Sequence, residues 1–197
     1  MQKLLLAALL LAGCASSSLA QTADPYPKNE LFVGYSYEGA DVNSLTVNPG
    51  RAWMHGVNFE YTRKVNRIVG VTADFSGHVR RESLATTTGS VQHDREQYNL
   101  LGGLQLKARN RSRVTPFAHA LVGGGFFRGF SAVLSPAGNN YFFDDAKSFA
   151  AVFGGGLDVR ASRRITVRAL QADYNPTFFG KSRQNNFRLS FGVVFTR

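Results

Sequence analysis

Apolar and polar residues alternate along the last twelve residues of the chain, Asn186–Arg197. One side of this two-residue period carries Phe187, Leu189, Phe191, Val193 and Phe195. The other side carries Asn186, Arg188, Ser190 and Gly192. The pattern is typical of a β-strand with one apolar face. A strand of this kind at the chain end suits the closing of a barrel, because closure leaves no edge of unpaired backbone groups.

Seven earlier segments alternate in a similar way and are expected to be strands, at about residues 31–37, 53–62, 69–76, 98–107, 114–127, 149–159 and 165–169. Three of the connections between these segments are short, at residues 63–67, 109–113 and 161–164. Four other connections are long, at about residues 39–51, 79–96, 128–147 and 175–185, and the first of them is rich in Asn, Gly and Pro. Short and long connections that alternate along about eight strands predict an all-β fold, an eight-stranded antiparallel up-and-down transmembrane β-barrel.

The period alone does not say which face points inward, because soluble barrels of the lipocalin type alternate as well. The charged residues of the polar face are balanced in sign: they are Glu60, Asp74, Asp158, Lys107, Arg168 and Arg188. A soluble surface normally carries more charge, whereas a narrow interior needs compensated ions because an unpaired buried charge is very costly. Aromatic residues suited to an interfacial girdle lie near strand ends on the apolar face, at Tyr35, Tyr37, Trp53, Tyr61 and Tyr98. We therefore expect the apolar face to contact lipid and the six charged residues to form a polar network inside the barrel.

The N-terminal residues resemble a secretory signal peptide. A basic start is followed by a short apolar run, and small residues precede Gln21, so residues 1–20 are expected to be the signal, residues 21–30 a lead-in and residues 31–197 the barrel. Leu11–Cys14 also resembles a lipobox, in which Cys14 would be lipidated. Cleavage after Ala20 is preferred, because a protein anchored by its own barrel gains little from an acyl chain. Cys14 is the only cysteine, so no intramolecular disulfide is possible.

The net charge of +10 would suit an anionic partner. Export argues against nucleic acid and in favour of outer-membrane lipid. The three short connections hold basic residues and no acidic residue: Arg63, Lys64, Arg67, Arg109, Arg111, Arg113, Arg163 and Arg164. All of them should lie at one end of the barrel, where they would meet anionic headgroups favourably.

Candidate chemistry is sparse. A hydrolase of the Ser/His/acid type needs a nucleophile and a base within hydrogen-bond reach. The histidines are His55, His78, His93 and His119, and His119 lies on a strand with no evident nucleophile. A metal site formed by His78, His93, Asp94 and Glu96 in one loop is the alternative, although the ligand spacing is not a recognised one. The glycine runs lack the context of nucleotide-binding loops, so no catalytic residue, metal or cofactor is predicted.

The chain resembles the eight-stranded outer-membrane β-barrel family typified by the OmpA transmembrane domain and OmpX, through Gly70–Gly77, Pro116–Gly123, Gly154–Asp158 and Phe187–Phe195. The resemblance implies insertion by the outer-membrane assembly machinery, which in this family reads the last strand. It places the assembly signal at Ser190, Gly192 and Phe195. The chain departs from the family pattern by ending in Thr196-Arg197, where many members end in Phe.

The leading hypothesis is a non-enzymatic, monomeric protein of the bacterial outer membrane with a role in envelope integrity or in adhesion through its loops. Its interior charges act either as a structural plug or as the lining of a narrow pore, since side chains nearly fill an eight-stranded barrel. The alternative is a soluble periplasmic lipocalin-like carrier of an apolar ligand. A third hypothesis is a lipid hydrolase that depends on His119.

Overall fold

The computed structural model describes residues 27–41, 51–86, 89–108, 112–135, 138–179 and 182–197. Eight strands follow one another: β1 (Asn29–Asp41), β2 (Arg51–Lys64), β3 (Val69–Thr86), β4 (Gly89–Lys107), β5 (Val114–Ser135), β6 (Gly138–Arg160), β7 (Ile165–Phe179) and β8 (Ser182–Thr196). Each strand pairs antiparallel with its neighbours in sequence, and β8 returns to β1, so the barrel is closed. The predicted fold is confirmed. Among the described residues, no helix is long and apolar enough to cross a membrane.

The closing strand pairs with β1 from Glu30↔Thr196 to Gly39↔Phe187. Its apolar residues except Val194 point outward, and Phe191 is 55% exposed, whereas Arg188 and Ser190 are fully buried. In the other strands too the outward face is apolar and the buried charged residues point inward, although β4, β5 and β6 also place apolar residues inside. The soluble-carrier alternative required the opposite arrangement, with the apolar residues inside.

Three of the expected long loops are wrong, because the chain stays in strands there. β3 and β4 remain paired up to Thr86↔Gly89, and β5 and β6 remain paired up to Ser135↔Gly138. β7 and β8 remain paired up to Phe179↔Ser182. Of the first expected loop, at residues 39–51, both ends belong to β1 and β2, and residues 42–50 lie outside the described part of the chain.

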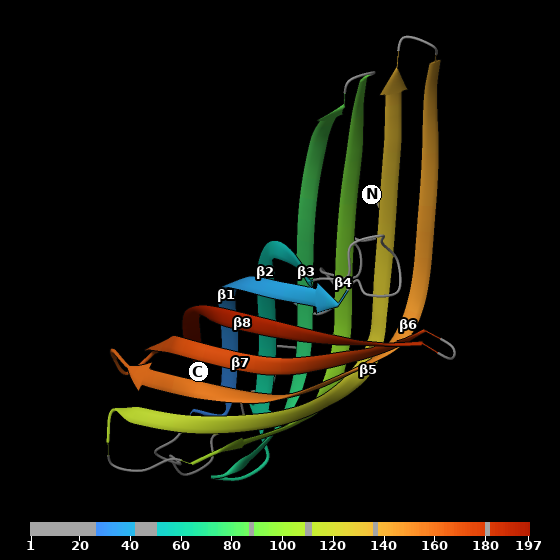
Figure 1. The fold of residues 1–197 in the computed structure, drawn as a ribbon. Helices are drawn as coiled ribbons and strands as arrows, with labels where there is room; N and C mark the ends of the chain where they lie inside the picture. The colour runs from blue at the N-terminus through green and yellow to red at the C-terminus, as the bar shows by residue number, and fades with distance from the viewer. Residues whose placement is uncertain (1–26, 42–50, 87–88, 109–111, 136–137, 180–181) are drawn as a thin grey trace.

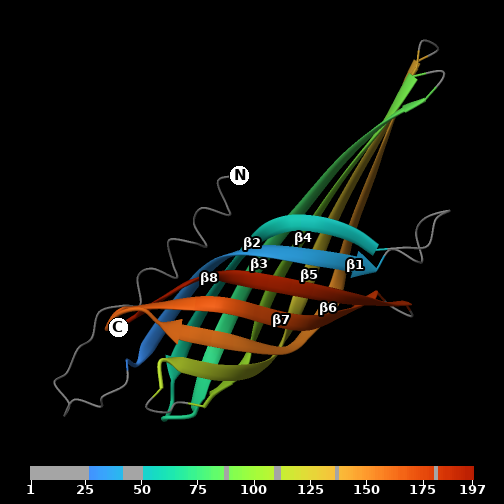
Figure 2. The same ribbon diagram turned by 60° about the vertical axis from the view of Figure 1, so that its left-hand side comes forward.

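Four strands continue past the barrel as a projecting sheet. β2 pairs with β3 as far as His55↔Val79, and β7 pairs with β6 as far as Phe149↔Phe178, whereas the pairing among β3, β4, β5 and β6 runs on. Figures 1 and 2 show these strands leaving one side of the barrel wall as a narrow sheet. We refer to residues 80–96 of β3 and β4 and 128–148 of β5 and β6, as far as they are described, as the projecting sheet. With the exception of Ala132, its described side chains are at least partly exposed on both faces, so the alternation that marks a half-buried strand is lost.

The outer face of these strands changes character abruptly at the base of the projecting sheet. Tyr98 pairs with Phe126 in an aromatic row on the outer face. One step beyond, Glu96 stands opposite Arg128, and Arg128 stands opposite Asp145. Cross-strand pairs of opposite charge stabilise a sheet by roughly 0.2–1 kcal/mol each, and charge of this density is excluded from hydrocarbon. A membrane-spanning barrel would therefore leave the hydrocarbon at this level.

Candidate functional site

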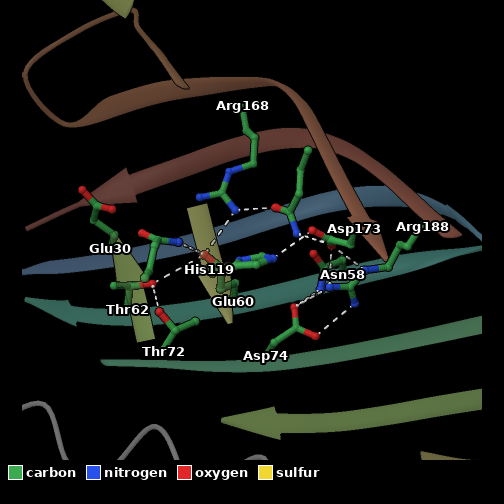
Figure 3. A network of polar contacts seen from close by, with 12 residues as sticks. Glu30, Asn58, Glu60, Thr62, Thr72, Asp74, His119, Arg168, Asp173 and Arg188 are labelled. Carbon is green, nitrogen blue, oxygen red and sulfur yellow. Dashed lines mark hydrogen bonds and ion pairs between the residues drawn. The ribbon is translucent and has the colours of Figure 1, made fainter. Parts of the chain in front are cut away.

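The barrel interior is crossed by a network of buried charges, which is the candidate site. Among the described residues it contains six carboxylates (Glu30, Glu38, Glu60, Asp74, Asp158 and Asp173), four cations (Lys64, Lys107, Arg168 and Arg188) and two histidines (His78 and His119). They come from all eight strands, because each strand turns every second side chain inward. Figure 3 shows the middle of this network.

The lowest layer, beside the short turns, joins two lysines to two carboxylates. Lys64 Nζ lies 2.7 Å from Glu30 Oε1, and Lys107 Nζ lies 2.7 Å from Glu30 Oε2. Lys107 Nζ also lies 2.5 Å from Asp158 Oδ2. Lys64 was expected on the surface of the turn. However, β2 extends to Lys64, and adjacent residues of a strand face opposite sides, so Arg63 points outward and Lys64 points inward.

Arg168 on β7 links this layer to the middle of the barrel. Its Nε donates to Asp158 Oδ1 at 3.0 Å, and its Nη1 donates to Glu60 Oε1 at 3.2 Å and to Gln171 Oε1 at 2.6 Å. A guanidinium offers donors in a rigid planar fork, so it can hold two carboxylates from different strands at once. The side chain is essentially fully buried.

Two aromatic rings enclose the same guanidinium. Its Cζ atom lies 4.3 Å from the centroid of Phe32 and 4.1 Å from that of Phe117. Such cation–π contacts are favourable, and they are stronger when water is excluded. Room for Phe32 comes from Gly34 and its register partner Gly192, since a Cβ on either would strike the Phe32 ring. The interior is therefore aromatic as well as ionic around Arg168.

His119 on β5 lies between two carboxylates. Its Nε2 is 2.8 Å from Asp173 Oδ1, and its Nδ1 is 3.5 Å from Glu60 Oε2. Both ring nitrogens thus face acids, which leaves neither of them to activate a nucleophile, as a hydrolytic triad would need. The geometry gives His119 the place of a bridge between strands.

Arg188 on β8 extends the network toward the opposite end. Its Nη2 lies 2.8 Å from Asp173 Oδ2, and its Nη1 donates to Asp74 Oδ1 at 3.0 Å. Asn58 donates to the second Asp74 oxygen at 2.5 Å. One buried guanidinium therefore connects β3, β7 and β8 across the lumen.

The uppermost layer is held by neutral donors around Glu38. Gln97 donates to Glu38 Oε1 at 2.5 Å, and Asn175 donates to the same oxygen at 3.4 Å. His78 Nδ1 lies 3.4 Å from Glu38 Oε2, and its Nε2 lies 2.8 Å from Ser36 Oγ. The ionic network therefore ends in an amide and hydroxyl layer at the level where the projecting sheet begins.

An apolar cluster completes the interior. It is formed by Leu101, Leu121, Ala150 and Val152 of β4, β5 and β6, and all four are buried. These strands carry apolar residues on both faces, so the sequence pattern of β5 did not show which of its residues point into the barrel. The register resolves it, because Leu121 and His119 point inward while Val122 points outward and is 52% exposed.

All six charged residues expected in the interior network, Glu60, Asp74, Lys107, Asp158, Arg168 and Arg188, are buried in the barrel. They do not pair only with one another, since Glu30, Glu38, Lys64, His119 and Asp173 supply the remaining partners. Glu30 and Glu38 continue the alternation of the first strand and could have been found by extending it. Asp173 could not, because a register shift between Arg168 and Gln171 places both of these residues inward and breaks the period.

The alternative metal site is wrong in its geometry, because its residues are on strands and not in one loop. His78 points into the barrel toward Ser36, whereas His93 contacts Ser131 Oγ at 2.8 Å in the projecting sheet. Asp94 and Glu96 have the opposite parity to His93 on β4 and so belong to the other face. His55 lies on the outer face, where it contacts the Tyr35 hydroxyl.

The three residues of the expected assembly signal have different surroundings. Ser190 is buried and its hydroxyl lies 3.1 Å from that of Ser36. Gly192 faces inward beneath Phe32, whereas Phe195 points outward and is 49% exposed. Cys14, the lipidation alternative, and the expected signal peptide, residues 1–20, lie outside the described residues.

The inner face of the projecting sheet carries a second group of charges. Arg80 and Arg95 stand opposite each other, and Glu82 stands opposite His93. Arg80 pairs with Glu82 and donates to the Trp53 carbonyl at 3.1 Å. The hydrogen bond from Arg80 lowers the pKa of Glu82 from its usual value, so this carboxylate is ionised at neutral pH.

Solved structures of similar fold are membrane barrels. Ail, the attachment invasion locus protein of Yersinia pestis, is 16% identical with a TM-score of 0.56, over 86% of this chain and 99% of its own. Neisserial surface protein A is 15% identical with a TM-score of 0.55, over 86% and 97%. The outer membrane protease OmpT from Escherichia coli is 9% identical with a TM-score of 0.54, over 92% and 99%. At these identities the likeness shows the fold alone.

Comparison with curated proteins gives no significant match. The family model described as the outer membrane protein beta-barrel domain matches residues 6–195. This match covers almost the whole chain, and it agrees with the closed barrel and its apolar outer face. The protein therefore belongs to the outer membrane β-barrel family, and it lies in the bacterial outer membrane with that face against lipid.

Proposed function

We propose that the protein is a non-enzymatic, monomeric adhesin in which a filled barrel holds the projecting sheet away from the membrane. The observation that carries the proposal is the sheet itself, since four strands continue together beyond the level where the outer face becomes charged. The histidine best placed for catalysis, His119, is held between two carboxylates inside the barrel.

The chemistry of the projecting sheet suits a polar partner. Its outer face alternates in sign through Glu96, Arg128 and Asp145, and its inner face carries Arg80 and Arg95. Long, paired strands present these groups at fixed spacing, which reduces the entropy lost on binding. The name of the similarly folded Yersinia pestis protein, attachment invasion locus, is compatible with such a role.

Shortening the sheet tests adhesion. In the short-sheet variant, residues 82–93 and 131–142 are each replaced by Asn-Gly, so that Arg81↔Asp94 and Phe130↔Phe143 become the last pairs. We expect Escherichia coli cells that display the full chain to be retained on cultured epithelial monolayers, and cells with the short-sheet variant to fall to the level of vector-only cells. A faster-migrating band before boiling serves as the control for a folded barrel in both.

Equal retention of the two strains, or no retention above the vector-only level with the full chain, would contradict the proposed adhesive role.

The second candidate function, a role in envelope integrity, is favoured by the charges that join the strands across the lumen. It predicts that the full chain and the short-sheet variant protect cells equally against detergent, because the two proteins have the same barrel.

The interior network, in this proposal, is a structural plug. Arg168 and Arg188 each join carboxylates on different strands, so they hold the wall closed and fill the lumen. The barrel is then a rigid base for the sheet and not a diffusion channel.

Replacing Arg168 by Leu removes the charge while keeping an apolar side chain between Phe32 and Phe117. Glu60 and Asp158 then lose a buried partner, which should lower the free energy of unfolding by about 3–5 kcal/mol. Urea titration of the fast-migrating band measures the change. Arg183→Leu is the matched control, because Arg183 is exposed on β8, and its effect should stay within about 0.5 kcal/mol. Adding Glu60→Gln to Arg168→Leu should recover part of the loss, and an unchanged stability in Arg168→Leu would exclude the plug.

The outer-membrane assembly machinery is the proposed partner during insertion, with Ser190, Gly192 and Phe195 read before the barrel closes. Ser190 and Gly192 also pack inside the finished barrel, so their replacement would change stability as well as recognition. Phe195 lacks this second role, because its ring faces lipid.

Phe195→Ala should therefore slow insertion into proteoliposomes that contain the assembly machinery several-fold, with the urea midpoint of the folded protein little changed. Phe191→Ala is the matched control, since Phe191 lies on the same face of β8 and is similarly exposed. Equal insertion rates for the two variants would remove Phe195 from the signal.

A further inference from the structure

The end of the barrel that carries the short turns is lined by exposed arginines. We define the basic belt as Arg63 and Arg67 around the β2–β3 turn, Arg113 before β5, and Arg160, Arg163 and Arg164 around the β6–β7 turn. In the part of this end that the structure describes, the nearby acids Glu30, Glu60 and Asp158 are buried and face the lumen. The exposed charge of this end is thus of one sign.

Apolar residues are interleaved with the basic belt. Val65 is 69% exposed and Ile68 is 59% exposed, and they flank Arg67 in the β2–β3 turn. Ile165, directly after Arg164, is 41% exposed on the outer face. Arginines alternating with exposed aliphatic side chains favour a membrane surface over a soluble polyanion, because the aliphatic groups gain by entering the hydrocarbon boundary while the guanidinium groups reach the phosphates.

The backbone holds these turns in place. Asn66 Oδ1 accepts hydrogen bonds from the amides of Ile68 and Val69, both at 2.8 Å. Neighbouring turns are joined as well, since Arg160 N donates to Arg113 O at 2.8 Å and Thr196 N donates to Arg164 O at 2.9 Å. The arginines therefore project from fixed points on a closed ring.

Among the residues that the structure describes at the opposite end, charges of both signs are mixed on the surface. There Glu96 and Asp145 alternate with Arg128, and Arg80 pairs with Glu82. The asymmetry means that only one leaflet of the membrane meets a surface of a single sign.

We propose that the basic belt selects anionic phospholipid in the leaflet that it contacts, which is the periplasmic leaflet for barrels with short periplasmic turns. The ligand chemistry is the phosphate of a phosphatidylglycerol-type headgroup, bound by guanidinium groups while Val65 and Ile68 enter the acyl boundary. The selection is local to this end and does not depend on the adhesive role of the projecting sheet.

Fluorescence quenching by brominated lipid tests this preference, because the chain has a single tryptophan, Trp53, at the opposite rim. The reporter variant Trp53→Phe/Ile68→Trp moves the fluorophore into the basic belt, and the unaltered chain serves as the matched control. Full-length protein is reconstituted in vesicles in which either the phosphatidylglycerol or the phosphatidylcholine is brominated. The ratio of quenching by the two lipids gives their relative association constant at each site.

We expect a ratio of about fivefold or more in favour of phosphatidylglycerol at residue 68, which corresponds to about 1 kcal/mol for one basic residue near the surface. At Trp53 the ratio should be close to one. Raising the ionic strength to about 0.5 M should abolish the preference at residue 68, because screening weakens exposed charge interactions.

Removing the charge gives the second arm. In the reporter variant, replacing four belt arginines by Gln should bring the quenching ratio at residue 68 near one; these are Arg63, Arg67, Arg163 and Arg164. As the matched control, four arginines at the opposite end are replaced by Gln, and the ratio should stay unchanged; these are Arg51, Arg81, Arg128 and Arg183. If the belt variant fails to fold, the salt series on the intact belt still decides. A ratio near one at residue 68, or an equal preference at both reporters, overturns the proposal.

Discussion

A charge inside this barrel can be neutralised only by another charge inside it, and the rest of the structure depends on that constraint. The outer face meets lipid, which offers no counterion, so Arg168 and Arg188 must find their carboxylates inside the barrel. Asp158 and Asp173 are register partners on the adjacent strand. Glu60 on β2 and Asp74 on β3 belong to strands that are not neighbours of β7 and β8, so these two ion pairs cross the lumen. Side chains that bridge the lumen also occupy it, so the same ion pairs hold the barrel wall together and fill its interior.

The projecting sheet follows from the same strands under a different solvent. Within the membrane, β3 to β6 keep polar groups on the inner face alone. Beyond the row of Tyr98 and Phe126, both faces meet water, and the outer positions become charged at Glu96 and Arg128. The filled barrel fixes the lower halves of these strands, so their upper halves start from a rigid base. This arrangement places a polar surface at a distance from the membrane without a separate domain.

The closing strand was predictable from sequence because one of its faces meets lipid and the other meets buried polar groups, a contrast that alternation records directly. The expected loops at residues 79–96 and 128–147 were wrong because alternation records burial and not strand pairing, and in the projecting sheet both faces are wet. Within the site, Arg168 and Arg188 were evident as polar positions in otherwise regular strands. Asp173 was hidden by the register shift that follows Arg168. The role of His119 was hidden as well, because β5 is apolar on both sides and only the register shows which side faces Asp173.

The central claim is that paired charges fill the lumen, and the conductance of the purified protein in planar lipid bilayers tests it most directly. Because Arg168 and Arg188 bridge the lumen from several strands, the account predicts a membrane that stays closed or shows only small, brief steps, at neutral pH and moderate voltage. A stable, large conductance from the intact, folded protein would contradict it, since ions would then cross where the ion pairs are placed.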